Sequence, residues 1–123
     1  MAKYKKGNDD RGWVLTNVDE KKLLLEDQLS NLQTVASSKY AAAFSSRIRN
    51  WERALNLISE CIEVWVQVQK KWMYLEGIFI GNEDIKQQLK EESKKFEKNN
   101  LAFKKVMEHT YKTPNIYACC VLY

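Results

Sequence analysis

Apolar residues recur at helical spacing along most of the chain. From residue 44 to residue 65 they follow one another at intervals of four and three, at Phe44, Ile48, Trp51, Leu55, Ile58, Ile62 and Trp65. This spacing places them on one face of an α-helix. A second set recurs every seven residues, at Ala54, Cys61, Val68 and Leu75, and widens that face. A wide apolar face indicates burial against more than one neighbour, so the pattern favours a helical bundle over a two-stranded coiled coil.

The apolar spacing along the chain predicts three helices, over about residues 17–37, 42–76 and 83–111. Gly77 is expected to end the second helix, and Asn82 or Asp84 to cap the third. Pro114 follows the end of the third helix, which it cannot continue. The predicted fold class is all-α, with long antiparallel helices in a bundle that is a fragment of a larger helical rod.

The chain is predicted to consist of three regions. Residues 1–12 carry no periodic apolar signal and are expected to form a flexible N-terminal segment. Residues 13–112 hold the helical bundle. Residues 113–123 form an apolar tail that ends in Val-Leu-Tyr, and we interpret this tail as truncated.

Composition and charge add little to this picture. With 45% hydrophobic and 29% charged residues, the chain has the composition of a folded protein. Its net charge is +4, but the lysines of residues 81–112 alternate with Glu91, Glu92 and Glu97, which is typical of a solvated helix face. We therefore predict no nucleic-acid partner. No apolar run approaches the length of a membrane span, and no membrane partner is predicted.

The sequence offers no pattern for catalysis. Its cysteines, Cys61, Cys119 and Cys120, have no zinc-site or redox spacing, and their odd number without a signal peptide favours a reducing compartment. His109 is the single histidine, and no phosphate-binding, dinucleotide-binding or metalloprotease motif occurs. All Asp and Glu residues fall at positions expected to face solvent. We predict no catalytic, cofactor-binding or metal-binding residue, and a structural or interaction module rather than an enzyme.

Large side chains instead mark the second helix. Trp65, Val68, Trp72, Leu75 and Phe79 follow at intervals of three, four, three and four. Together with Trp51 they form what we call the structural ridge, which is expected to be buried. Rigid aromatic rings bury large areas and fix the packing of neighbouring helices, so the ridge suits a stiff element.

The sequence around this ridge resembles the linker, or N-terminal region 2, of dynein heavy chains, and is most similar to axonemal heavy chains. The resemblance covers roughly residues 11–120. It rests on an ordered string: Trp51-Glu52, Trp65, Val68-Gln69, Trp72-x-Tyr74-Leu75-Glu76, Ile78-Phe79, Asp84-Ile85 and Gln88-Leu89, with "GWVL" and "LLLEDQLSNLQTVASSKY" upstream. The chain departs from the family at Lys90, where a proline is usual, and the third helix is expected to begin earlier for that reason.

The resemblance implies that residues 13–112 are a linker-type bundle. In this family the linker is the helical lever that changes position with ATP state and so drives movement along microtubules. The implied partners are the rest of the heavy chain, namely neighbouring linker helices and the ATPase ring, and ATP and magnesium would bind elsewhere in the parent. A cytoplasmic, cytoskeletal location in a cilium or flagellum axoneme follows. Two alternatives remain open, self-association of the excised segment and a free-standing helical adaptor that binds a partner helix.

Overall fold

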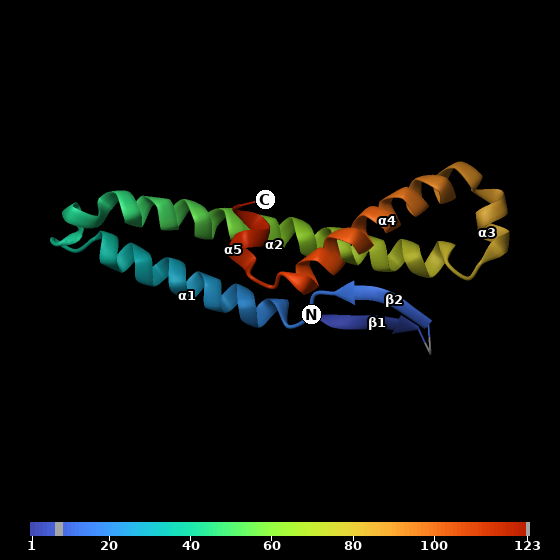
Figure 1. Cartoon of the computed structure of the whole chain (residues 1–123), viewed down its shortest axis with the longest axis horizontal. Helices are drawn as coiled ribbons and strands as arrows, with labels where there is room; N and C mark the ends of the chain where they lie inside the picture. Colours follow the sequence, from blue (N-terminus) through green and yellow to red (C-terminus); the bar gives the residue numbers. More distant parts are fainter. Residues whose placement is uncertain (7–8, 123) are drawn as a thin grey trace. The chain divides into compact units, whose positions relative to one another are not determined.

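The structure, a computed structural model, describes residues 1–6 and 9–122 and divides into two compact units. The first unit comprises Met1–Thr16 and Trp65–Pro114, and the second comprises Asn17–Val64 and Asn115–Tyr123. The long helix α2 (Ser45–Phe79) contributes to both (Figure 1). Gly7, Asn8 and Tyr123, which belong to the predicted flexible segment and tail, lie outside the described residues.

The second unit pairs α1 (Val18–Ala36) with residues 45–64 of α2. The two helices are antiparallel, because Lys22 near the start of α1 forms an ion pair of 2.6 Å with Glu63. The buried side chains come from α2, at Ile48, Ala54, Ile58 and Ile62, whereas α1 has none. A 3₁₀ turn, η1 (Ala41–Phe44), and a short helix, α5 (Ile116–Cys120), complete the unit.

The first unit combines residues 65–79 of α2 with α3 (Glu83–Gln88), α4 (Lys90–Lys112) and a β-hairpin. The hairpin pairs β1 (Ala2–Lys6) with β2 (Asp9–Val14) in antiparallel register, and β2 lies against α4 (Figure 1). The buried core of the unit consists of Val14, Trp72, Phe79, Phe96, Phe103 and Met107. Strand β2 thus contributes to the same core as the two helices.

Local signals explain where the helices begin and end. α2 continues through Gly77 to Phe79, and the chain turns at Gly81, whose φ of 96° suits glycine. The expected stop at Gly77 is therefore wrong. Asn82 caps α3 as predicted, since its side chain accepts a hydrogen bond of 3.3 Å from the backbone N–H of Ile85. Pro114 follows the end of α4, also as predicted.

The predicted third helix is divided in the structure. Leu89 has non-helical backbone angles (φ −118°, ψ 59°), so α3 ends before it and α4 begins after it. Lys90 is the first residue of α4. Proline is well tolerated at this position of a helix, so the lysine there does not disturb the helix boundary.

The N-terminal region needs a larger correction. The sequence pattern predicts a flexible segment over residues 1–12, but residues 2–6 and 9–12 lie in paired strands. The segment is rich in lysine and aspartate, which disfavour strands, so local propensity gives no signal for the hairpin. Its contacts with the helices supply the stabilisation instead. The fold class is mainly α, as predicted, with this small sheet added.

Candidate functional site

A stripe of five residues on α2 faces the rest of the first unit. We call it the inner stripe; it consists of Trp65, Gln69, Trp72, Glu76 and Phe79, at intervals of four, three, four and three. Trp72, Glu76 and Phe79 are 5%, 1% and 6% exposed, while Trp65 and Gln69 are half-buried. Two of the five positions are thus polar, and one of these carries a carboxylate that is almost fully buried.

The structural ridge expected from the sequence overlaps only partly with the inner stripe. Trp65, Trp72 and Phe79 belong to both, but Val68 and Leu75 are 45% and 37% exposed. Trp51, in the second unit, is 51% exposed and lies near Tyr117, with ring centroids 5.6 Å apart. Compared with the predicted ridge, the buried face of α2 contains Gln69 in place of Val68 and Glu76 in place of Leu75. The expectation that every acidic residue faces solvent is therefore wrong at Glu76.

α4 packs antiparallel to the inner stripe. Trp72 Nε1 donates a hydrogen bond of 2.7 Å to Asn100 Oδ1, and the Trp72 ring stacks on Phe103 with centroids 4.5 Å apart. Toward one end Phe79 stacks on Phe96, and toward the other Trp65 Nε1 donates to the sulfur of Met107 at 3.1 Å. The amide oxygen of Asn100 thus accepts a hydrogen bond inside the core, so this contact is directional as well as apolar.

The hairpin binds the two polar positions of the inner stripe. Gln69 makes two hydrogen bonds with the backbone of Leu15, accepting from its N–H at 2.7 Å and donating to its carbonyl at 3.1 Å. Glu76 forms an ion pair and hydrogen bond with Arg11, which also contacts Asp9 at 2.8 Å. Because a buried carboxylate requires a counter-charge, Glu76 fixes the position of the hairpin on α2.

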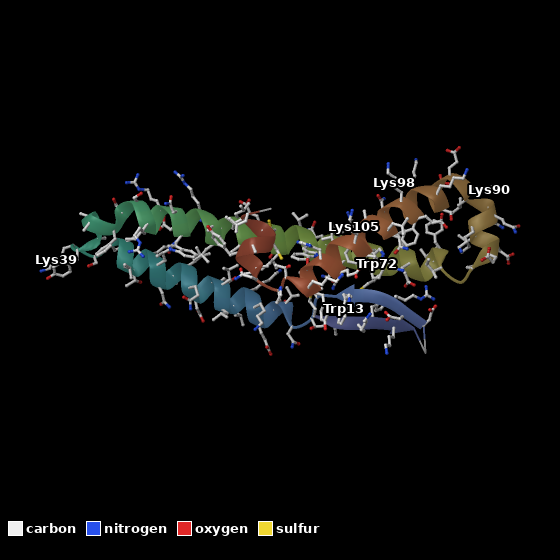
Figure 2. All side chains as sticks on the ribbon, viewed as in Figure 1. Trp13, Lys39, Trp72, Lys90, Lys98 and Lys105 are labelled. Carbon is white, nitrogen blue, oxygen red and sulfur yellow. The ribbon has the colours of Figure 1, made fainter. Side chains whose placement is uncertain are left out.

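Aromatic contacts attach the hairpin to both helices. Trp13 stacks on Tyr111 of α4, with centroids 3.6 Å apart and an interplanar angle of 13°. The Lys3 ammonium lies 4.5 Å from the centroid of the Trp13 ring. On α2, Tyr4 meets the edge of Trp72 at 5.5 Å; Figure 2 labels Trp13 and Trp72. We call this set of hairpin contacts with α2 and α4 the hairpin brace.

Titratable groups have perturbed pKa values at a few places. Hydrogen bonds from Lys3 and from the Gly12 N–H lower the pKa of Asp10, and a hydrogen bond from Lys112 lowers that of Glu108. In the second unit, burial and the neighbouring Cys61 raise the pKa of Cys120 to about 12. A thiol with so high a pKa is protonated near neutral pH and is a poor nucleophile.

Neither a metal-binding cluster nor a helix able to span a membrane occurs in the described part of the chain. No group of three or more His, Cys, Asp or Glu side chains is arranged there to hold a metal ion. None of the helices in residues 1–6 and 9–122 combines the length and apolar character needed to cross a membrane. In the first unit a strand pair is joined to two antiparallel helices through polar contacts, those of Gln69 with Leu15 and of Glu76 with Arg11.

Sequence reasoning missed Arg11, Gln69 and Glu76. The signal was present for the last two, because they complete the four-and-three spacing of Trp65, Trp72 and Phe79 on α2. Because both residues are polar, the repeat of apolar residues does not include them. For Arg11 the sequence holds no comparable signal, since its partner lies 65 residues away.

Comparisons with known proteins show the family of the chain. The family model described as dynein heavy chain, N-terminal region 2, matches residues 1–122. The chain is 47% identical over 120 residues to dynein axonemal heavy chain 10 of Homo sapiens, and 45% identical over 121 residues to the dynein-1-alpha heavy chain, flagellar inner arm I1 complex, of Chlamydomonas reinhardtii. Each alignment covers 98% of this chain but only 3% of the relative. A chain that matches the region so completely belongs to the dynein heavy chain family.

Proposed function

We propose that this chain is a stiffening part of the linker of an axonemal dynein heavy chain, the lever that changes position with ATP state. A lever transmits force only when it resists bending. The hairpin brace supports this role, because it ties α4 and the C-terminal part of α2 together through a third element. The membership of the chain in the family favours a heavy-chain segment over the free-standing adaptor that the sequence pattern left open.

The observation that carries the proposal is the polar character of the inner stripe. A helix that only needed a core would place apolar side chains at positions 69 and 76. Gln69 and Glu76 instead bond the backbone of Leu15 and the guanidinium of Arg11. Such contacts have preferred directions, whereas the hydrophobic effect is non-directional. The brace therefore suits an element that must keep its shape under load.

Further parts of the proposal concern the parent protein. ATP and magnesium bind in its ATPase ring rather than in this segment, which has no cofactor and no catalytic role of its own. Its partners are neighbouring linker helices and that ring. The relatives are named axonemal and flagellar, which supports a place in the cytoskeleton of a cilium or flagellum.

The test uses a heavy chain that carries this segment with Trp13→Ala. The substitution removes the stack on Tyr111 and loosens the hairpin without opening the core around Trp72. We expect microtubule gliding velocity to fall while the ATPase rate is retained, because force transmission suffers and nucleotide chemistry does not. The matched control is Trp51→Ala, because Trp51 is half exposed and lies outside the first unit.

Hydrogen exchange on the isolated chain shows separately whether Trp13→Ala releases the hairpin. If the β1 and β2 amides exchange faster and the gliding velocity is unchanged, the brace does not stiffen a lever. A parallel fall of velocity and ATPase rate would also contradict the proposal.

A further inference from the structure

The positive charge of the chain is concentrated in the first unit. Residues 1–16 and 65–114 hold fourteen basic and nine acidic side chains, a net charge of +5, whereas the remaining residues hold six and seven, a net charge of −1. A field of one sign steers an oppositely charged partner toward the surface that carries it. The net charge of +4 therefore belongs to one unit rather than to the whole chain.

Within that unit, α4 carries an ordered set of exposed lysines. Its buried residues, Ser93, Phe96, Asn100, Phe103, Met107 and Thr110, occupy one side of the helix. On the opposite side lies what we call the basic stripe, which consists of Lys90, Lys94, Lys98, Leu101 and Lys105. With 3.6 residues per turn these five positions fall within an arc of about 80° and extend over about 22 Å. Figure 2 shows Lys90, Lys98 and Lys105 following one another along α4.

The four lysines have no carboxylate partner among residues 1–6 and 9–122. The ion pairs of α4 in that range are confined to Glu108 and Lys112, which lie beyond the end of the stripe. Leu101, near the middle, is 69% exposed. An exposed leucine between unpaired ammonium groups combines an apolar contact with charge, as at the seam of two paired helices.

We propose that the basic stripe docks an amphipathic helix of a separate protein, one that carries a stripe of carboxylates around a small apolar centre. The spacing of Lys94, Lys98, Leu101 and Lys105, at intervals of four, three and four, matches the repeat that such a helix would present. The net charge of +5 on the first unit would accelerate the association of an acidic protein that diffuses in solution, which favours a separate protein as the partner. This inference is independent of the lever proposal, since it requires only the surface of the first unit.

A nucleic acid fits the stripe less well. Glu91 and Glu97 flank it on either side, and they would repel a continuous row of phosphates. The stripe also holds no arginine, the residue best suited to bidentate phosphate contacts. The same flanking carboxylates can pair with lysines at the edges of a partner helix, as in e/g pairing of coiled coils.

The probe is a labelled synthetic helical peptide that carries three glutamates. They follow one another at intervals of four and seven residues, and a single leucine lies between the last two. Fluorescence anisotropy at low and physiological salt measures its binding to the whole chain. We expect the triple variant Lys94→Gln, Lys98→Gln and Lys105→Gln to weaken binding about tenfold or more, since each exposed pair contributes modestly and the three act together. Glutamine preserves helix propensity, so circular dichroism should show unchanged folding.

The matched control removes three exposed lysines elsewhere, with Lys21→Gln, Lys70→Gln and Lys71→Gln. It changes the net charge equally and should weaken binding by less than about threefold. A peptide of the same composition with scrambled glutamates should bind more weakly than the striped one. Lys→Arg at the three stripe positions should restore binding, because the charge is retained.

Three results would overturn the inference. One is the absence of binding of the striped peptide to the unmodified chain. Another is an equal loss in the stripe and control variants, which would indicate general electrostatics. The third is tighter binding of a single-stranded oligonucleotide of equal charge through the same lysines, which would assign the surface to nucleic acid.

Discussion

Replacing Arg11 with leucine removes the guanidinium that faces Glu76, whose side chain is 1% exposed. Breaking a buried ion pair by removing one partner typically costs about 3–5 kcal/mol, because the remaining charge loses its compensation. Since 1 kcal/mol lowers the Tm of a chain of this length by about 4 °C, we expect Arg11→Leu to lower the Tm by about 12–20 °C.

Replacing Glu76 instead of Arg11 should have a smaller effect on stability. In Glu76→Leu the arginine keeps its 2.8 Å contact with Asp9, and its side chain is 12% exposed, so part of its charge stays solvated. A buried leucine adds about 1.5–3 kcal/mol of apolar burial, which offsets the loss of one charged hydrogen bond, about 1.5–3 kcal/mol. Glu76→Leu should therefore change the free energy of unfolding by no more than about 1 kcal/mol. The double variant should resemble Glu76→Leu.

Urea denaturation followed by tryptophan fluorescence measures these differences, and the three tryptophans of the first unit report on its unfolding. Because the double variant should resemble Glu76→Leu, the double-mutant cycle should give a coupling energy between Arg11 and Glu76 equal to the cost of Arg11→Leu, about 3–5 kcal/mol. A coupling below about 1 kcal/mol, or equal losses in the two single variants, would refute the reasoning that Glu76 depends on this counter-charge.

Four further predictions concern other parts of the chain. Trp72→Ala should destabilise the first unit by about 3–5 kcal/mol through the cavity it leaves, whereas the half-exposed Trp51→Ala should cost less than about 1 kcal/mol; equal Tm values would contradict this. Gly81→Ala should cost about 1–2 kcal/mol, because a φ of 96° strains any side chain. Gly77→Ala, inside α2, should instead stabilise the chain by about 0.5–1 kcal/mol in the same denaturation assay. The folded-state pKa of Cys120 is raised from 9.0 to about 12, so the contribution of this thiol to the free energy of unfolding should be complete below pH 9 and decline above it. Alkylation of Cys120 at pH 8, measured by mass spectrometry, should be much slower in the folded chain than in urea.

The helical pattern was largely predictable from the sequence. Intervals of four and three located the helices, and the cap at Asn82 and the stop before Pro114 agree with the structure. These features depend on neighbouring residues, which a sequence displays directly. Gly77 misled the prediction because a glycine in an exposed helix position costs less than the surrounding helix gains.

The hairpin brace was not predictable in the same way. β1 and β2 lack the β-branched alternation of an ordinary strand pair, and their stability comes from Trp13, Arg11 and Leu15 meeting residues far along the chain. Those contacts also decide which face of α2 is buried. Without knowledge of the hairpin, polarity alone favours Val68 and Leu75 over Gln69 and Glu76 as the inner residues of α2.

The hydrogen bond between Trp72 and Asn100 has one more consequence. A slip of α4 along α2 by one helical turn would move the amide by about 5.4 Å and leave both it and the indole N–H without a partner in the core, at about 1–3 kcal/mol each. The same slip would separate Phe79 from Phe96 at one end and Trp65 from Met107 at the other. The contact thus fixes the axial register of α4 on α2, so that sliding of one helix along the other is not a low-energy motion.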